Sequence, residues 1–101
     1  MLGLILYFLL SPINDRVEGT TADYLLTGSA YVHFWGDQGE SVAVAARDNH
    51  FTVITTYNDH IVIRCDPIPS LATDLERLSR DAAVERITFT QEGLYASRNS
   101  P

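Results

Sequence analysis

Polar and apolar positions alternate with unusual regularity in the middle of the chain. Three polar tetrads, DQGE (37–40), RDNH (47–50) and YNDH (57–60), follow one another at intervals of ten residues. The segments between them, SVAVAA, FTVITT and IVIRC, are rich in β-branched residues, which favour strands. Each tetrad contains a residue pair suited to a two-residue hairpin turn. The pattern therefore predicts a four-stranded antiparallel meander over about residues 30–36, 41–46, 51–57 and 60–65.

Two-residue turns would determine which residues share a face of this meander, because side chains alternate along a strand. One predicted face is a conventional core face: Val32, Phe34, Ala43, Ala45, Thr52, Ile54, Ile61, Ile63 and Cys65. The other is aromatic and apolar, with one histidine and one arginine: Tyr31, His33, Trp35, Val42, Val44, Phe51, Val53, Thr55, Tyr57, Val62 and Arg64. A slip of one residue would exchange the two faces within a strand, so this assignment depends on the turn lengths.

A helical pattern follows the meander. Leucines recur at helical spacing over about residues 71–80, and either Ser70 or the capping-box sequence TDLE (73–76) can begin this helix. The segment RITFT (86–90) then alternates again and predicts a returning strand or hairpin over about residues 85–95. Together these elements predict one α+β domain over residues 1–101, with the helix covering the core face of the sheet.

For the first 29 residues, the sequence does not distinguish between strand and helix. The apolar run LGLILYFLL (2–10) suits a strand or a short helix, and TADYLL (21–26) can form a short helix that ends at Thr27-Gly28. The run is about half of the roughly 20 residues that span a bilayer, and no Lys or Arg precedes it as in a signal peptide. We expect no stable membrane insertion, with an interfacial anchor as the alternative. Residues 97–101 are expected to form a loose tail.

Net charge and cysteine content limit the kinds of partner and compartment that the chain is expected to have. The chain of 101 residues has a net charge of −6, and its seven basic residues are all arginines. Such an acidic chain has no electrostatic attraction for a phosphate backbone, so we expect no nucleic-acid binding. The charge can attract a partner with a basic surface, or it can only keep the chain soluble. The single cysteine, Cys65, excludes an internal disulfide and favours a reducing, cytoplasmic compartment.

The predicted register separates the residues that could perform chemistry. His50 and His60 would lie at opposite ends of one strand, roughly 20 Å apart, and His33 would lie far from both. A metal ion needs three or four ligands around it, so we expect no metal site and no cofactor. Cys65 falls on the core face, where a thiol is inert, and no glycine-rich phosphate loop occurs in the sequence.

Two weaker groups remain as binding candidates. His33 and Arg64 would share one row of the aromatic face, about 14 Å apart, and can hold the two ends of an anionic ligand or rim a protein interface. Asp37, Glu40 and Asp59 would emerge together at one end of the sheet. They can meet a basic partner or a loosely held cation, or simply form the turns.

An aromatic sheet face cannot remain in water without a risk of aggregation, so a partner, a second copy or the N-terminal segment must cover it. The candidate partner-binding residues are Tyr31, His33, Trp35, Phe51, Tyr57 and Arg64. Our hypothesis is a non-catalytic protein-interaction module, of the kind seen in small acidic inhibitors, immunity proteins and adaptors, which also forms a homodimer. The alternative is a small anionic-ligand-binding protein or minor enzyme with a pocket between the sheet and the N-terminal segment.

Overall fold

The computed structural model describes residues 12–90 of the chain. In this part, three helices accompany one sheet: α2 (Thr21–Thr27), α3 (Gly39–Asp48) and α4 (Leu71–Ser79). The six strands are β1 (Pro12–Asn14), β2 (Val17–Thr20), β3 (Ser29–Phe34), β4 (Thr52–Thr56), β5 (His60–Arg64) and β6 (Val84–Thr88). Their order is β1-β2-β6-β3-β5-β4, and all neighbours are antiparallel except β2 and β6, which are parallel. The predicted α+β class is confirmed, with a mixed six-stranded sheet in place of the meander.

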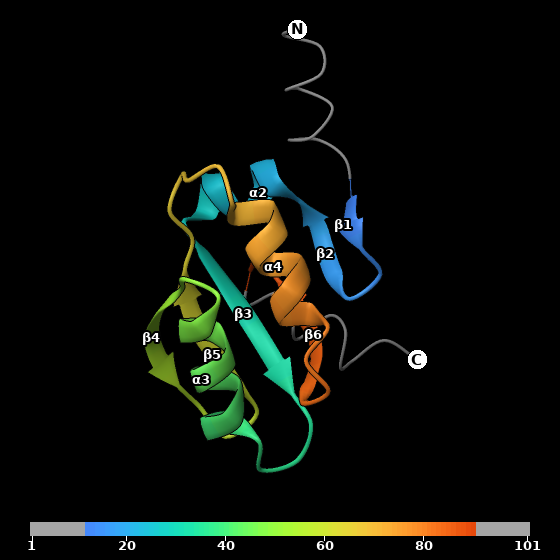
Figure 1. The fold of residues 1–101 in the computed structure, drawn as a ribbon, viewed down its shortest axis with the longest axis vertical. Coiled ribbons are helices and arrows are strands. Elements are labelled where there is room, and N and C mark those ends of the chain that lie inside the picture. The colour runs from blue at the N-terminus through green and yellow to red at the C-terminus, as the bar shows by residue number, and fades with distance from the viewer. Residues whose placement is uncertain (1–11, 91–101) are drawn as a thin grey trace, which may run out of the picture.

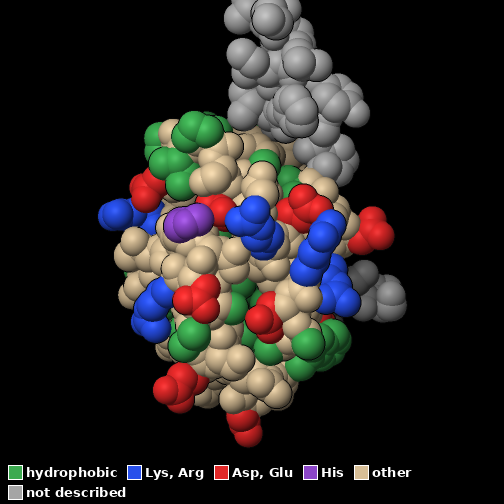
Figure 2. Space-filling view, viewed as in Figure 1, with side chains coloured by type: hydrophobic (Ala, Val, Ile, Leu, Met, Phe, Trp, Pro, Cys, Tyr) green, Lys and Arg blue, Asp and Glu red, His purple; other side chains and the backbone are tan. Residues whose placement is uncertain are grey.

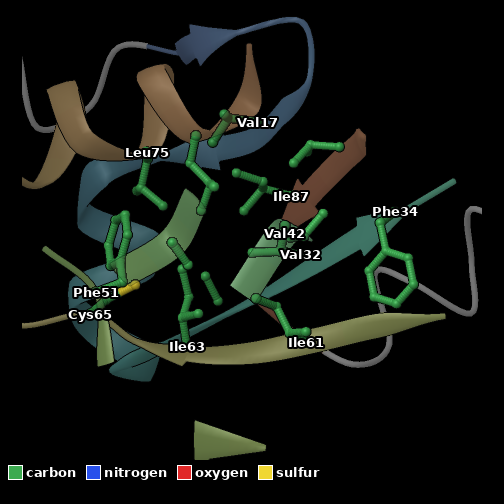
Figure 3. Packing of buried hydrophobic residues seen from close by; sticks show 14 of the residues in the cluster. Val17, Val32, Phe34, Val42, Phe51, Ile61, Ile63, Cys65, Leu75 and Ile87 are labelled. Atoms are coloured by element: carbon green, nitrogen blue, oxygen red, sulfur yellow. The ribbon is translucent and has the colours of Figure 1, made fainter. Parts of the chain in front are cut away.

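Helices α3 and α4 lie against the same face of the sheet (Figure 1), α3 over β4 and β5, and α4 over β6, β1 and β2. Helix α2 packs beside β2 and β3. The core between these layers is apolar, and Figure 3 shows its side chains pointing from the strands toward the helices. It includes Ala30, Val32 and Phe34 from β3, Ile61 and Ile63 from β5, and Leu71, Leu75 and Leu78 from α4.

Residues 39–48 form helix α3, so the strand predicted over 41–46 is wrong. The segment contains three alanines, which favour helix. Val42, Ala43 and Ala46 are buried, whereas Val44 is exposed. This is the spacing of one helical face toward the core. The Val-Ala alternation that favoured a strand is equally compatible with a helix, because the small alanines fit both faces.

With α3 outside the sheet, β3 pairs with β5, and the predicted order of strands is replaced. The last hairpin is nevertheless as predicted near its turn, where Thr55 faces Val62. A β-bulge between Val53 and Thr55 then shifts the register by one residue. This shift leaves Ile54 exposed, although it was predicted on the core face.

Two further face assignments are corrected. Phe51, predicted on the aromatic face, is buried in the core, where its ring lies beside the sulfur of Cys65 (Figure 3). Thr52, predicted on the core face, is exposed opposite Arg64. Both residues precede the bulge, and the shift of one residue against β5 turns each of them to the opposite face.

The N-terminal half of the sheet completes the fold. Strands β1 and β2 extend the sheet beyond β6, and α2 forms where TADYLL indicated a helix, ending at Gly28 with a left-handed φ of 73°. Tyr24 of α2 is fully buried, with its hydroxyl 2.7 Å from the carbonyl oxygen of Glu18. Burial raises the pKa of this phenol far above its ordinary value, with the Glu18 charge as the next cause.

The helix predicted at 71–80 is confirmed as α4, but Thr73 lies inside it and Ser70 precedes its first residue, so the capping box does not begin it. None of the helices within residues 12–90 is long and apolar enough to cross a membrane. The apolar run 2–10, the predicted turn after residue 90 and the expected tail 97–101 lie outside the described residues.

Helix α3 ends in a Schellman motif, in which the amides of His50 and Phe51 donate to carbonyls of the last turn, at 3.1 and 3.0 Å. His50 takes the left-handed position of this motif, with φ of 72°, where glycine is usual. Its imidazole Nδ1 lies 3.3 Å from the buried carboxylate of Asp74, which also accepts a hydrogen bond from Ser70 Oγ at 2.8 Å. The contact therefore links the end of α3 to the start of α4.

We expect His50→Gly to be more stable than His50→Ala by about 1 kcal/mol. Both variants lose the contact with Asp74, but only glycine adopts the left-handed conformation without steric strain. The measurement is urea unfolding of the two variants. Asn49 is the matched control because its φ is −102°: there, Gly should be no better than Ala. Equal stability of the two His50 variants would contradict a strained left-handed residue.

Candidate functional site

The ends of β3 and β4 and the start of β5 meet at one end of the sheet, and this end gathers exposed aromatic side chains. Trp35 follows β3 directly and is 55% exposed, and Tyr57 follows β4 and is 53% exposed. The strand ends are joined by the amide of Phe34, which donates to the carbonyl of Asp59 at 3.2 Å. The two aromatic residues therefore stand on one hydrogen-bonded platform, which we call the aromatic end and define as Tyr31, His33, Trp35, Tyr57 and His60.

Two histidines lie opposite each other at the aromatic end. His33 of β3 and His60 of β5 are cross-strand partners, and each side chain is only 12% exposed. The predicted separation of His33 from His60 is therefore wrong, because it assumed that two strands lay between them. They point away from the helices, since they alternate with the core residues Val32 and Ile61.

Each histidine is held by a carboxylate through Nδ1. The distances are 2.6 Å from His33 to Glu85 Oε2 and 2.7 Å from His60 to Asp59 Oδ1. Glu85 is the extra residue of a β-bulge in β6, and such a bulge redirects a side chain out of the regular alternation. In neutral His60, donation from Nδ1 to Asp59 leaves Nε2 as the acceptor, so the carboxylate sets the tautomer.

The imidazole of His60 lies between two tyrosine rings. Tyr57 stacks on it with a centroid distance of 4.7 Å and an interplanar angle of 21°, and Tyr31 lies at 5.9 Å. Nε2 of His60 is buried and has no hydrogen-bond partner, a condition that it shares only with Thr21 Oγ1 among the buried side-chain atoms of residues 12–90. The stack with His60 holds the exposed Tyr57 ring in one orientation.

Not all predicted binding residues meet here. Phe51 belongs to the core, and Arg64 faces Ser29 at the opposite end of β3, where it pairs with Asp66 at 3.2 Å. His33 and Arg64 therefore lie at opposite ends of adjacent strands, not in one row as predicted. Of the six candidates, the structure brings Tyr31, His33 and Tyr57 together around His60, and Trp35 follows β3 at the same end of the sheet.

The predicted acidic group lies around the same end. Asp37 belongs to the loop after β3, Glu40 to the first turn of α3, and Asp59 to the turn before β5. In Figure 2, acidic side chains occupy the lower tip of the molecule in this view, and no Lys or Arg side chain is visible there. Glu85 belongs to this end too, but the sequence alone did not indicate it, because its place depends on the long-range pairing of β3 with β6.

Comparison of the chain with protein families, with curated proteins and with solved structures gave no match. What the site can do is therefore inferred from its geometry alone. Within residues 12–90, no group of three or more His, Cys, Asp or Glu side chains could hold a metal ion.

A hollow of about 300 Å³ lies between the β1–β2 turn and the end of α4, lined by Asn14, Asp15, Arg16, Ser79 and Arg80. Two of these residues already hold the helix: Asn14 Nδ2 donates to Ser79 Oγ at 2.7 Å, and Arg16 Nη1 donates to the Ser79 carbonyl at 3.2 Å. The pocket expected near His33 and Arg64 does not coincide with this hollow.

Cys65 is the one cysteine of the chain and is buried in the core. Burial, and after it the neighbouring Asp66 charge, raises the pKa of its thiol from 9.0 to about 12. The thiolate is the reactive form, so Cys65 is inert in the folded protein at neutral pH.

We expect the native thiol to react with a disulfide reagent at pH 8 at least about 100-fold more slowly than the thiol unfolded in urea. A Val44→Cys variant, with its exposed position on α3, is the control and should react at the rate of a free thiol. Equal rates for Cys65 and the control would contradict the burial of the thiol.

The same pKa shift has a consequence for stability at high pH. In the unfolded chain the thiol ionises with its ordinary pKa, whereas in the folded protein it stays neutral up to about pH 12. Ionisation of Cys65 therefore leaves the free energy of unfolding unchanged below about pH 9 and lowers it between about pH 9 and 12. Tyr24 acts in the same direction at still higher pH. Urea unfolding of the wild type and of Cys65→Ala should show a smaller alkaline loss in the variant.

Proposed function

We propose that this protein is a non-catalytic interaction module that binds a protein with a basic surface through the aromatic end. The observation that carries the proposal is the position of Trp35 and Tyr57. Both are large aromatic side chains more than half exposed, and both stand at the end of the sheet where the turn before β5 carries Asp59 and the loop after β3 carries Asp37. Aromatic anchors of this size dominate the binding energy of protein interfaces.

The packing beneath these anchors supports a binding role. Tyr57 stacks on His60, and the two histidines are fixed by Glu85 and Asp59 at 2.6 and 2.7 Å. A side chain already ordered in the free protein loses less conformational entropy on binding. His33 and His60 act in this proposal as a rigid floor, and Trp35 and Tyr57 as the surface that a partner covers.

Charge supports a basic partner. The chain carries a net charge of −6, and Asp37, Glu40 and Asp59 lie around the aromatic end. Opposite charges speed association and select among partners more than they raise affinity. Small acidic inhibitors, immunity proteins and adaptors remain our predicted class, and binding is expected to weaken as salt rises.

The test begins with a library of extended peptides of net positive charge, offered to the full-length chain and to the double variant Trp35→Ala/Tyr57→Ala. Proteins captured from a lysate that share the selected basic sequence are then purified, and their dissociation constants are measured. We expect the double variant to weaken binding by about 30-fold or more, which is the loss of roughly 2 kcal/mol typical of an interface anchor.

The matched control is Leu26→Ala/Val44→Ala, which removes two exposed apolar side chains from α2 and α3. Binding should survive in this control. A basic partner that binds the aromatic-end variant as tightly as the wild type, or that is lost equally from the control, would refute the proposal.

A further inference from the structure

Strand β4 forms one outer edge of the described sheet and pairs only with β5 there. Its sequence, TVITT, consists entirely of β-branched residues and contains no charge and no proline. The unpaired amide and carbonyl groups of an outer strand can accept another strand, and natural proteins usually prevent this with charged residues or proline. In the centre of this edge, Ile54 is 55% exposed.

The opposite edge of the described sheet has a different character. Among the described residues, this edge is strand β1, Pro12–Asn14, whose proline has no amide hydrogen to donate. Of the two described edges, β4 is therefore the better suited to accept another strand. An antiparallel two-fold contact uses the same edge of both copies, so pairing through β4 closes at two copies.

We propose that two copies of this chain pair through β4 in an antiparallel, two-fold symmetric arrangement centred on Ile54, making one continuous sheet of six strands from each copy. The inference does not rest on the proposed function, since it is argued from the edge of β4 and not from Trp35 or Tyr57. It places a homodimer at the edge of β4, whereas the sequence predicted one through the aromatic face.

The residues of β4 are complementary to themselves in this arrangement. The two-fold axis places Ile54 against Ile54, and Thr52 against Thr56 of the second copy, while Val53 meets Thr55. β-branched and threonine pairs of this kind stabilise neighbouring strands. No charged side chain lies within the strand, so the net charge of −6 on each copy is not concentrated at the contact.

The bulge in β4 accounts for the exposure of Ile54. The register between β4 and β5 skips this residue, which leaves it without a partner on β5. A bulge can also protect an edge by twisting it away from other strands. A protective bulge predicts a monomer, and a bulge that presents Ile54 to a second copy predicts a dimer, so the molar mass decides between them.

The first experiment is sedimentation velocity of the full-length chain over a range of concentrations, at low and at high salt. We expect a species of about twice 11.2 kDa whose population grows with concentration. Salt should strengthen this dimer, because the long-range repulsion between two acidic copies is screened within about 10 Å at 0.1 M. Binding of a basic partner has the opposite salt dependence, so the two kinds of association are distinguishable.

Ile54→Lys should raise the dissociation constant of the dimer by about tenfold or more, since a lysine at an edge opposes strand pairing. Val44→Lys is the matched control. It adds the same charge at a side chain of α3 that is 50% exposed, and should leave the dimer intact. Circular dichroism is the check that both variants are folded. Trp35→Ala/Tyr57→Ala should also remain dimeric.

A cross-link tests the register directly. Opposed residues of an antiparallel pair lie about 4.5–5.5 Å apart at Cα, which is within the range that a disulfide bridges. Ile54→Cys should therefore form a covalent dimer under mild oxidation, against the inert background of buried Cys65. Val44→Cys should not. A monomer at every concentration, a dimer that survives Ile54→Lys, or a dimer lost only from the aromatic-end variant would each overturn the proposal.

Discussion

Pairing of β3 on both of its edges is the constraint on which the rest of the structure depends. Its neighbours are β5 on one side and β6 on the other, and its buried residues Ala30, Val32 and Phe34 all point toward the helices. Strict alternation then sends Tyr31 and His33 to the opposite face. The core and the aromatic end are therefore two sides of one strand, and a slip of one residue in β3 would exchange them.

How much of this arrangement the sequence predicts depends on how local the responsible interactions are. Helix α4 was predictable because Leu71, Leu75 and Leu78 recur at helical spacing. Helix α3 was not, because valines and alanines alternate in a segment whose flanking tetrads resemble hairpin turns. The tetrad RDNH is in fact a helix end, in which His50 occupies the left-handed position that glycine normally takes.

The candidate site shows the same limit. Trp35 and Tyr57 were predicted as anchors from their residue type and their place on the expected aromatic face. The meeting of His33 with His60, and the contact of His33 with Glu85, were beyond reach, because they follow from pairings between distant strands and from a bulge in β6. Because α3 was predicted as a strand, the expected sheet had two strands between His33 and His60, and their place as neighbours was missed.

The hydrogen bonds from Asn14 and Arg16 to Ser79 join residues far apart in the sequence. Arg16 reaches the carbonyl of Ser79 across 63 residues, and Val17 of β2 is paired with Ile87 of β6. On the ribosome, β2 emerges early but cannot find its place in the sheet until β6 has been made. Contacts of such long separation slow folding and leave apolar strand surface exposed in the meantime. Until β6 has been made, the nascent chain must therefore carry an unfinished sheet.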